Sequence, residues 1–255
     1  MSPNVLFEIK GPEAVITLNR PAKRNAYDQD MIDAIADGLH KAGANSDVRV
    51  VYLAASGPAF SAGVDLTAER GTSIDVRRRR TESLYIGLDR VHKELGKPTI
   101  ALVDGAARAG GCTLAFMCDM ILATRNASFA LPEIERGKIP GYHLAYLPRV
   151  MGKSKAFSFA FTGRVMDAAE AERLGIVSEV VEDAEALGAR RAWYTEQFSK
   201  CSAEAIRVAK DVFYHGMDLE FAKAARIAVN GMHVLNAQGE VDKGLNEFER
   251  QRREN

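Results

Sequence analysis

The sequence lacks the features that mark several large classes of protein. Its three cysteines, Cys112, Cys118 and Cys201, have neither the paired spacing of a zinc site nor the even number of a disulfide framework. Its formal net charge is zero, which gives no reason to expect nucleic acid or a membrane as partner. No run approaches the roughly 18 apolar residues of a membrane span, and residues 1–10 do not resemble a signal peptide. We therefore expect a cytoplasmic protein.

What is present is a pattern of apolar segments that predicts an α/β fold. Alternating residues at 5–9 and 15–18, separated by a Gly-Pro turn, predict a hairpin. Continuous apolar runs at 48–54 and 99–103 predict strands that are buried on both faces. Asp28 precedes apolar residues at helical spacing and is a candidate helix cap.

Helix formers dominate the last third of the chain. After a strand predicted at 176–181, helices are expected at residues 187–198, 204–214, 219–234 and 241–250. Residues 66–80 have many charges and little apolar periodicity, which predicts a mobile or surface segment. The order of these elements indicates an α/β core at residues 1–190 with a helical extension at residues 191–255.

Small residues follow two of the predicted strands. They lie in the segment from Phe60 to Leu66 and in the segment from Ala109 to Ala115, which contains Gly110 and Gly111. Glycine has no Cβ to keep a backbone N–H away from a ligand, and the N–H groups at a helix start are unpaired and partly positive. Each segment alone is more often an ordinary turn, but two such donors aimed at one oxygen would form an oxyanion hole.

Five ordered motifs together resemble the crotonase family, which comprises enoyl-CoA hydratases and isomerases. They are NRPAKRNA at residues 19–26, FSAGVDL at 60–66, AGGCTLAFMCD at 109–119, FALPEIERGKIPG at 129–141 and LGIVSEVV at 174–181. The resemblance extends over nearly the whole chain, so it is far more specific than a single glycine pattern. It implies a crotonase-like spiral of β-β-α turns and an acyl-CoA substrate. It also implies a homotrimer or homohexamer assembled through the C-terminal helices.

The resemblance also implies roles for particular residues. By position, the N–H groups of Val64 and Gly110 would be the oxyanion donors. Six residues would lie along the coenzyme A: Lys23, Arg24, Ala26, Ala62, Asp65 and Leu66. Coenzyme A would enter as part of the substrate. Because no metal cluster, P-loop or dinucleotide fingerprint is found in the sequence, we expect no separate cofactor.

Glu133 is the candidate for proton transfer. It follows Pro132, so it lies on a rigid turn rather than on a solvated helix face. A lone glutamate at such a position is usually a surface charge, but the motif implies a catalytic role here. A carboxylate beside a thioester can remove the α-proton while an oxyanion hole stabilises the enolate.

Thr113 stands where hydratases of this family usually carry a second glutamate. Two carboxylates suit the addition of water, whereas one suits the movement of a proton along a single substrate. Thr113 could still hold a water by hydrogen bond, so we expect double-bond isomerisation or a one-glutamate hydration of an enoyl-CoA. The alternatives are a CoA-thioester hydrolase, a retro-aldol lyase, or a relative that binds acyl-CoA without catalysis.

Two further features of the sequence, a bulky pair of residues and an arginine run, can each be interpreted in two ways. Tyr142 and His143 replace a small, glycine-rich run, so they could reshape the acyl pocket, and His143 could act as an acid or base. A packed or hydrogen-bonded histidine at a helix start is the commoner case. The run from Arg77 to Arg80 is typical of a solvated face, although arginine also suits the phosphates of coenzyme A.

Overall fold

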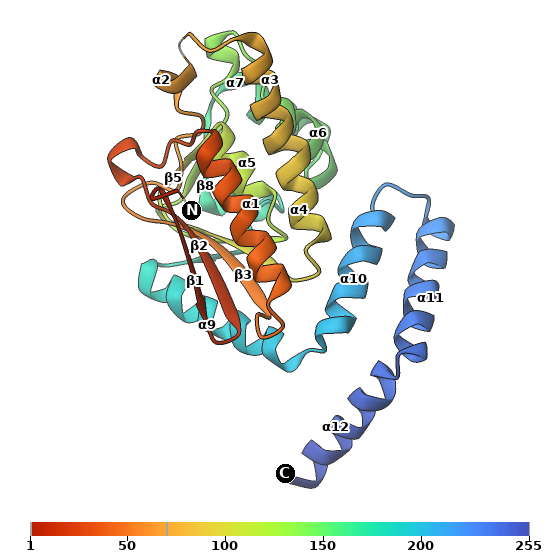
Figure 1. The fold of residues 1–255 in the computed structure, drawn as a ribbon. Coiled ribbons are helices and arrows are strands. Elements are labelled where there is room, and N and C mark those ends of the chain that lie inside the picture. Colours follow the sequence, from red (N-terminus) through yellow and green to blue (C-terminus); the bar gives the residue numbers. More distant parts are fainter. Residues whose placement is uncertain (1, 70, 255) are drawn as a thin grey trace.

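Two sheets carry the fold in the computed structural model, which describes residues 2–69 and 71–254 (Figure 1). The larger sheet has the strand order β1 (Val5–Lys10), β2 (Glu13–Leu18), β3 (Val50–Ala55), β4 (Thr99–Val103), β6 (Met120–Thr124) and β9 (Glu179–Val181). The smaller sheet has the order β5 (Ala106–Arg108), β7 (Ser128–Ala130) and β8 (Val165–Asp167). The predicted α/β class is confirmed.

The strands follow from the apolar pattern of the sequence. The predicted hairpin is β1 and β2, which pair antiparallel, and the next neighbours β3, β4, β6 and β9 all pair parallel. All five residues of β4 are buried, as a continuous apolar run predicts. The strand predicted at 176–181 is confined to β9, because Ile176 and Val177 pack into the core before the ladder begins.

Helices connect the strands and cover the sheets. They include α1 (Gln29–Ala44), α5 (Gly110–Phe116), α6 (Gly141–Val150), α7 (Lys153–Thr162) and α8 (Ala168–Arg173), with short 3-10 turns at η1 (Pro21–Lys23) and η3 (Ile134–Arg136). The predicted cap of α1 is confirmed, since the carboxylate of Asp28 accepts a hydrogen bond from the N–H of Met31 at 3.1 Å.

Residues 66–80, predicted to be a mobile or surface segment, lie at the surface but form regular helix. This part of the chain forms α2 (Leu66–Glu69) and α3 (Ile74–Glu82), and α3 continues through a π-helical turn, η2 (Ser83–Leu88), into α4 (Asp89–Glu94). Of the residues in α3, Arg80 alone is buried. The helix is therefore exposed nearly all round, and apolar periodicity could not reveal it.

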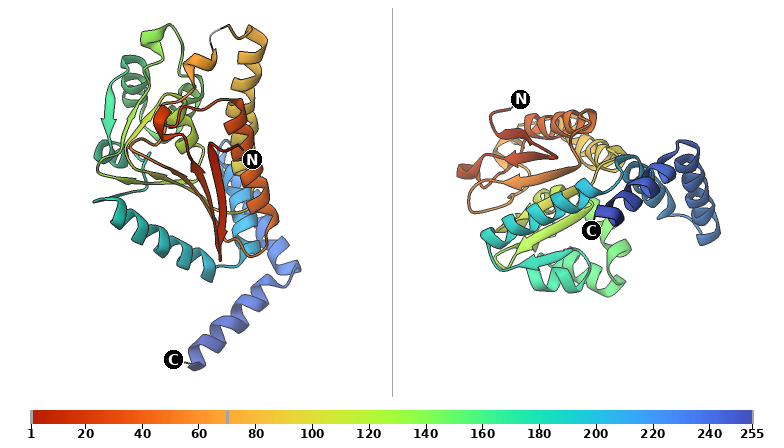
Figure 2. Two further views of the ribbon diagram at one scale, coloured as in Figure 1. Left: turned by 60° about the vertical axis from the view of Figure 1, so that its left-hand side comes forward. Right: turned by 90° about the horizontal axis from the view of Figure 1, so that it is seen from below.

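The predicted C-terminal helices are confirmed as α9 (Ala184–Lys200), α10 (Ala203–Gly216), α11 (Phe221–Ala237) and α12 (Glu240–Glu254). The boundary predicted between residues 190 and 191 falls inside α9, which packs Leu187 against the larger sheet. We call α11 and α12 the C-terminal arm, because they project away from the sheets (Figures 1 and 2). None of the described helices combines the length and apolarity that crossing a membrane requires.

Candidate active site

The two glycine-containing segments lie against each other at the ends of their strands. Ser61 forms a parallel bridge with Ala107, just before the second segment. A Cβ placed on Gly63 would lie 3.1 Å from the backbone nitrogen of Gly110, so the chains are in close contact. Gly63 also has a φ of +85°, a conformation that favours glycine. The structure thus brings Val64 and Gly110 to one place.

The N–H groups of Val64 and Gly110 have no acceptor within the described part of the chain. Tyr27 uses its own N–H and C=O to bond Gly63 and Asp65, so the N–H of Val64 between them faces the other way. Gly110 begins α5, where the first N–H groups have no partner in the helix. Both groups are therefore available to a ligand oxygen.

Close packing explains why the second segment needs two glycines. A Cβ on Gly110 would lie 1.8 Å from the hydroxyl oxygen of Tyr27, and a Cβ on Gly111 would lie 2.3 Å from the carbonyl oxygen of Ser61. Tyr27 and Ser61 are both fully buried. Neither can give way easily, so the position of α5 depends on the absence of both side chains.

Glu133 opens the turn η3, directly after Pro132. The residue is half-buried, and its Oε2 is buried without a hydrogen-bond partner among the described residues. Burial raises the pKa of this carboxyl above its usual range, because the charged form loses water. A carboxylate of this kind is a stronger base than an exposed one.

Tyr85, which the sequence did not single out, lies within electrostatic reach of Glu133. Burial raises the pKa of Tyr85, and the carboxylate of Glu133 raises it further. A Cβ on Gly141 would lie 3.2 Å from the Tyr85 ring, so the tyrosine lies against the start of α6. It belongs to the π-helical turn η2, a feature that is often found at functional sites.

Thr113 and His143, two residues singled out separately, form a pair. The Oγ1 of Thr113 lies 3.1 Å from the Nε2 of His143, and both side chains are fully buried. Burial lowers the pKa of His143 to about 4, so the ring is neutral near pH 7. The hydroxyl of Thr113 therefore has a protein partner.

The residues predicted to lie along the coenzyme A also meet in space. The N–H of Ala62 donates to the carbonyl oxygen of Arg24 at 2.9 Å, which joins the loop at η1 to the first glycine segment. Asp65 is buried and accepts hydrogen bonds from the Thr67 hydroxyl at 2.6 Å and from Arg20 at 2.7 Å. These bonds hold the pKa of Asp65 below its usual range. Its side chain is thus committed to the protein, and its N–H donates to the carbonyl oxygen of Tyr27 at 2.8 Å.

The other three residues of the predicted set differ in exposure. Two of them are exposed where a nucleotide could reach them, and the third is buried. Lys23 is exposed and its Nζ lies 3.4 Å from the Thr67 hydroxyl, while Leu66 has 47% of its surface exposed. Ala26 is buried in the same loop. The contribution of all six to coenzyme A binding stays a prediction.

The arginine run is divided by the helix α3 on which it lies. Arg80 is buried, whereas Arg77, Arg78 and Arg79 are exposed. Arg78 forms an ion pair with Glu82 at 2.8 Å, one turn along the helix. An exposed pair of this kind contributes little to stability. Arg77, Arg78 and Arg79 thus lie on a solvated face, whereas Arg80 does not.

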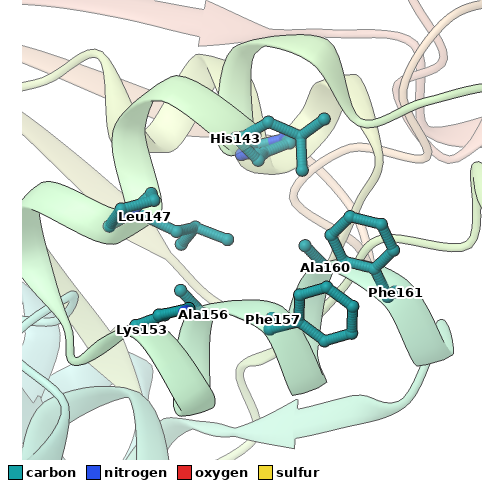
Figure 3. Close-up of a pocket in the computed structure, with 9 residues that line it drawn as sticks. His143, Leu147, Lys153, Ala156, Phe157, Ala160 and Phe161 are labelled. Atoms are coloured by element: carbon teal, nitrogen blue, oxygen red, sulfur yellow. The ribbon is translucent and has the colours of Figure 1, made fainter.

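Figure 3 shows an apolar cavity between α6 and α7. It has a volume of about 160 Å³, and its lining includes His143, Phe157 and Phe161. The rings of the two phenylalanines stack with their centroids 4.1 Å apart. Tyr142, one residue before His143, lines a separate cavity of about 330 Å³ and donates a hydrogen bond to Asp89 at 3.0 Å. Among the described residues, no group of three or more potential ligands is placed to hold a metal ion.

Known proteins resemble this chain in sequence. A family model described as enoyl-CoA hydratase/isomerase matches residues 8–255. A probable enoyl-CoA hydratase of Rhizobium meliloti is 36% identical over 249 residues, which cover 96% of this chain and 94% of the relative. A probable mitochondrial enoyl-CoA hydratase of Dictyostelium discoideum is 38% identical over 151 residues, which cover 58% of this chain and 53% of that relative.

Solved structures resemble it in fold. The crystal structure of an enoyl-CoA hydratase from Mycobacterium smegmatis has a TM-score of 0.91 and 30% sequence identity, and the match covers 98% of this chain and 97% of the other. An enoyl-CoA hydratase from Bacillus anthracis also has a TM-score of 0.91, at 25% identity, with coverage of 97% and 96%. The likeness includes the C-terminal helices, since nearly the whole of each chain is matched.

Proposed function

The chain belongs to the enoyl-CoA hydratase/isomerase family of the crotonase superfamily, and from this premise we propose that it transfers a proton within an enoyl-CoA thioester. Glu133 is the proposed base. The N–H groups of Val64 and Gly110 are the proposed donors to the thioester oxygen. Removal of an α- or γ-proton would place negative charge on that oxygen, and two fixed donors would stabilise it in the enolate.

The observation that carries this proposal is the state of Glu133. Its Oε2 is buried and has no partner in the described structure. Burial also raises the pKa of the carboxyl group. A carboxylate held for structural reasons would be expected to have a hydrogen-bond donor. A buried, unpartnered one with a raised pKa suits a group that takes up and returns a proton.

We favour isomerisation of the double bond over hydration. A base that takes a proton from one carbon and returns it to another needs one carboxylate only. Thr113 occupies the position of a second acid, and its hydroxyl is already bonded to His143 at 3.1 Å. The hydroxyl is also fully buried, which leaves it less able to reach an attacking water.

Hydration is the second candidate, and the names of the relatives favour it. Those from Rhizobium meliloti and Dictyostelium discoideum are both described as probable enoyl-CoA hydratases. In this chain Tyr85, whose pKa the Glu133 carboxylate raises, would be the group that helps to hold a water.

We also propose that the C-terminal arm assembles the protein into a trimer or hexamer. Large apolar side chains are exposed along it, including Phe221, Met232 and Phe248. Exposed apolar surface of this extent usually marks a binding surface.

We further propose a cytoplasmic location for the enzyme, in keeping with its three free cysteines. Recovery of the protein in an organelle fraction would refute this.

A panel of CoA thioesters in deuterated water, analysed by mass spectrometry, tests the reaction. Isomerisation should exchange carbon-bound hydrogen for deuterium without a gain of water. Hydration should add the elements of water, thioester hydrolysis should release free coenzyme A, and retro-aldol cleavage should shorten the acyl chain. Binding without any of these changes would contradict the proposal and support the non-catalytic alternative.

A further inference from the structure

One peptide unit of the proposed oxyanion hole has very different surroundings at its two ends. The C=O of Ala109 and the N–H of Gly110 belong to the same planar group and point in opposite directions. The N–H is free of acceptors in the described structure, whereas the carbonyl oxygen accepts from the N–H of Cys112 at 2.9 Å and of Thr113 at 3.3 Å. Both donors belong to α5, the helix that Gly110 begins.

A third donor to the same oxygen comes from a different helix. The Nε2 of His143, on α6, lies 3.3 Å from the carbonyl oxygen of Ala109. The ring is fully buried and makes edge-on contacts with the rings of Phe116, at 5.3 Å, and of Tyr142, at 5.7 Å. These neighbours fix the orientation of the imidazole.

The contacts determine which nitrogen of His143 carries the proton. A carbonyl oxygen can only accept a hydrogen bond, so its position beside Nε2 assigns the proton to that nitrogen. The neutral ring has no second proton, and its Nδ1 has no partner among the described residues. The one N–H of the ring is therefore directed at the oxygen of Ala109, with the Oγ1 of Thr113 close by at 3.1 Å.

We infer that His143 is a positioning residue for the oxyanion hole, which acts by donating its Nε2–H to the carbonyl oxygen of Ala109. This inference rests on the proposed function. A donor at the carbonyl polarises the peptide and makes its N–H a better donor, by roughly 10–30% per bond. The bond also fixes the plane of the peptide, whose first residue, Ala109, has a φ of 50° that is uncommon for a side chain with a Cβ.

The polarisation of a bound thioester measures this effect directly. We would bind crotonyl-CoA, isotopically labelled at the thioester carbonyl carbon, to protein that carries Glu133→Gln to prevent turnover. Infrared difference spectra should show the carbonyl stretch at lower frequency in the complex than in water. Adding His143→Met or His143→Leu should remove most of that shift. His143→Gln should retain it, because the amide N–H of glutamine can reach the same oxygen.

A matched control separates polarisation from packing. Leu147 is fully buried one turn further along α6 and lines the same cavity, so Leu147→Met disturbs the packing without touching the peptide. It should leave the shift unchanged. With Glu133 intact, His143→Met should lower kcat about tenfold with little change in KM, less than the ~10²–10³-fold that follows removal of an oxyanion donor.

The outcomes separate this inference from the proposed function. A full carbonyl shift in folded His143→Met and His143→Leu proteins would overturn the positioning role and leave the proposed function standing. An equal loss in Leu147→Met would overturn it too, since packing alone would then account for the effect. No shift in the parent complex would instead remove the oxyanion hole, and the proposed function with it.

Discussion

Two regions of the molecule differ in how closely they are packed. One is the region around the two glycine segments, and the other is the C-terminal arm. At the glycine segments, Gly110 and Gly111 are packed so closely against buried groups that a single Cβ would collide with Tyr27 or Ser61. Along the arm, Phe221 is 86% exposed and Met232 is 65% exposed. The first region leaves polar groups without partners among the described residues, including the N–H groups of Val64 and Gly110 and the Oε2 of Glu133, whereas the second leaves apolar side chains in water.

The difference shows two ways in which a structure can point to a missing partner. Polar groups that are buried without partners indicate a small molecule with matching polar atoms. Apolar groups that are exposed together indicate another protein surface, because burying them gains roughly 25 cal/mol per Å². Substitutions in the first region should therefore alter chemistry, and substitutions in the second should alter assembly.

The largest effect is expected at Glu133. Glu133→Gln keeps the size of the side chain but removes the base, so the rate should fall by at least the lower end of the ~10²–10⁴-fold range of general acid–base catalysis. Binding of CoA thioesters, measured by calorimetry, should survive. Glu135→Gln, at an exposed position in the same turn, is the matched control and should retain activity. Full activity of Glu133→Gln would remove this residue from the mechanism.

A somewhat smaller effect is expected from loss of one oxyanion donor. Gly110→Pro and Gly110→Ala both place a Cβ against Tyr27, but only proline removes the N–H. Both should lower the melting temperature, and proline should lower kcat/KM by a further ~10²–10³-fold. Equal activities of the two folded variants would show that the N–H of Gly110 does not act on the substrate.

Much of the glycine-segment region could be predicted from sequence because its constraints are local. The hairpin, the buried strands and the cap at Asp28 each depend on a few neighbouring residues, and all of them are confirmed. The two segments with small residues could be located because each comes a few residues after a predicted strand. The meeting of Val64 and Gly110 is then a consequence of neighbouring strands that run parallel.

The remaining features depend on distances that periodicity does not contain. Thr113 and His143 were singled out separately, and only the packing of α6 on α5 makes them a hydrogen-bonded pair. Tyr85 was missed because it lies among the apolar residues of η2, where a tyrosine at a site has the same pattern as a packing residue. A tyrosine far along the chain from Glu133 carries no local signal of their proximity.

Substitutions in the arm should change assembly before they change chemistry. Leu245 and Phe248 are both more than half exposed on α12, so replacing both with glutamine should weaken the oligomer. Sedimentation at micromolar concentration should show smaller species than the trimer or hexamer of the parent. Val165→Gln, at an exposed apolar position on β8, should leave assembly unchanged. A parent protein that is an active monomer would contradict the proposed assembly altogether.

The smallest effect, and the finest distinction between the two regions, concerns pH. Burial raises the pKa of Glu133 in the folded protein, so the folded state holds this proton more tightly than the unfolded state does. The contribution to stability is then greatest below the pKa of the unfolded chain, and it is lost as pH rises through the folded pKa. Glu133→Gln has no such proton, so it should become more stable relative to the parent as pH rises from 4 to 7. Urea unfolding at several pH values measures this difference.

In the same pH interval the parent should gain kcat/KM, because the base must be ionised. Leu245→Gln with Phe248→Gln should follow the parent in both profiles, since those positions carry no titrating group. A stability difference between Glu133→Gln and the parent that stays constant with pH would show that the carboxyl titrates as it does in the unfolded chain.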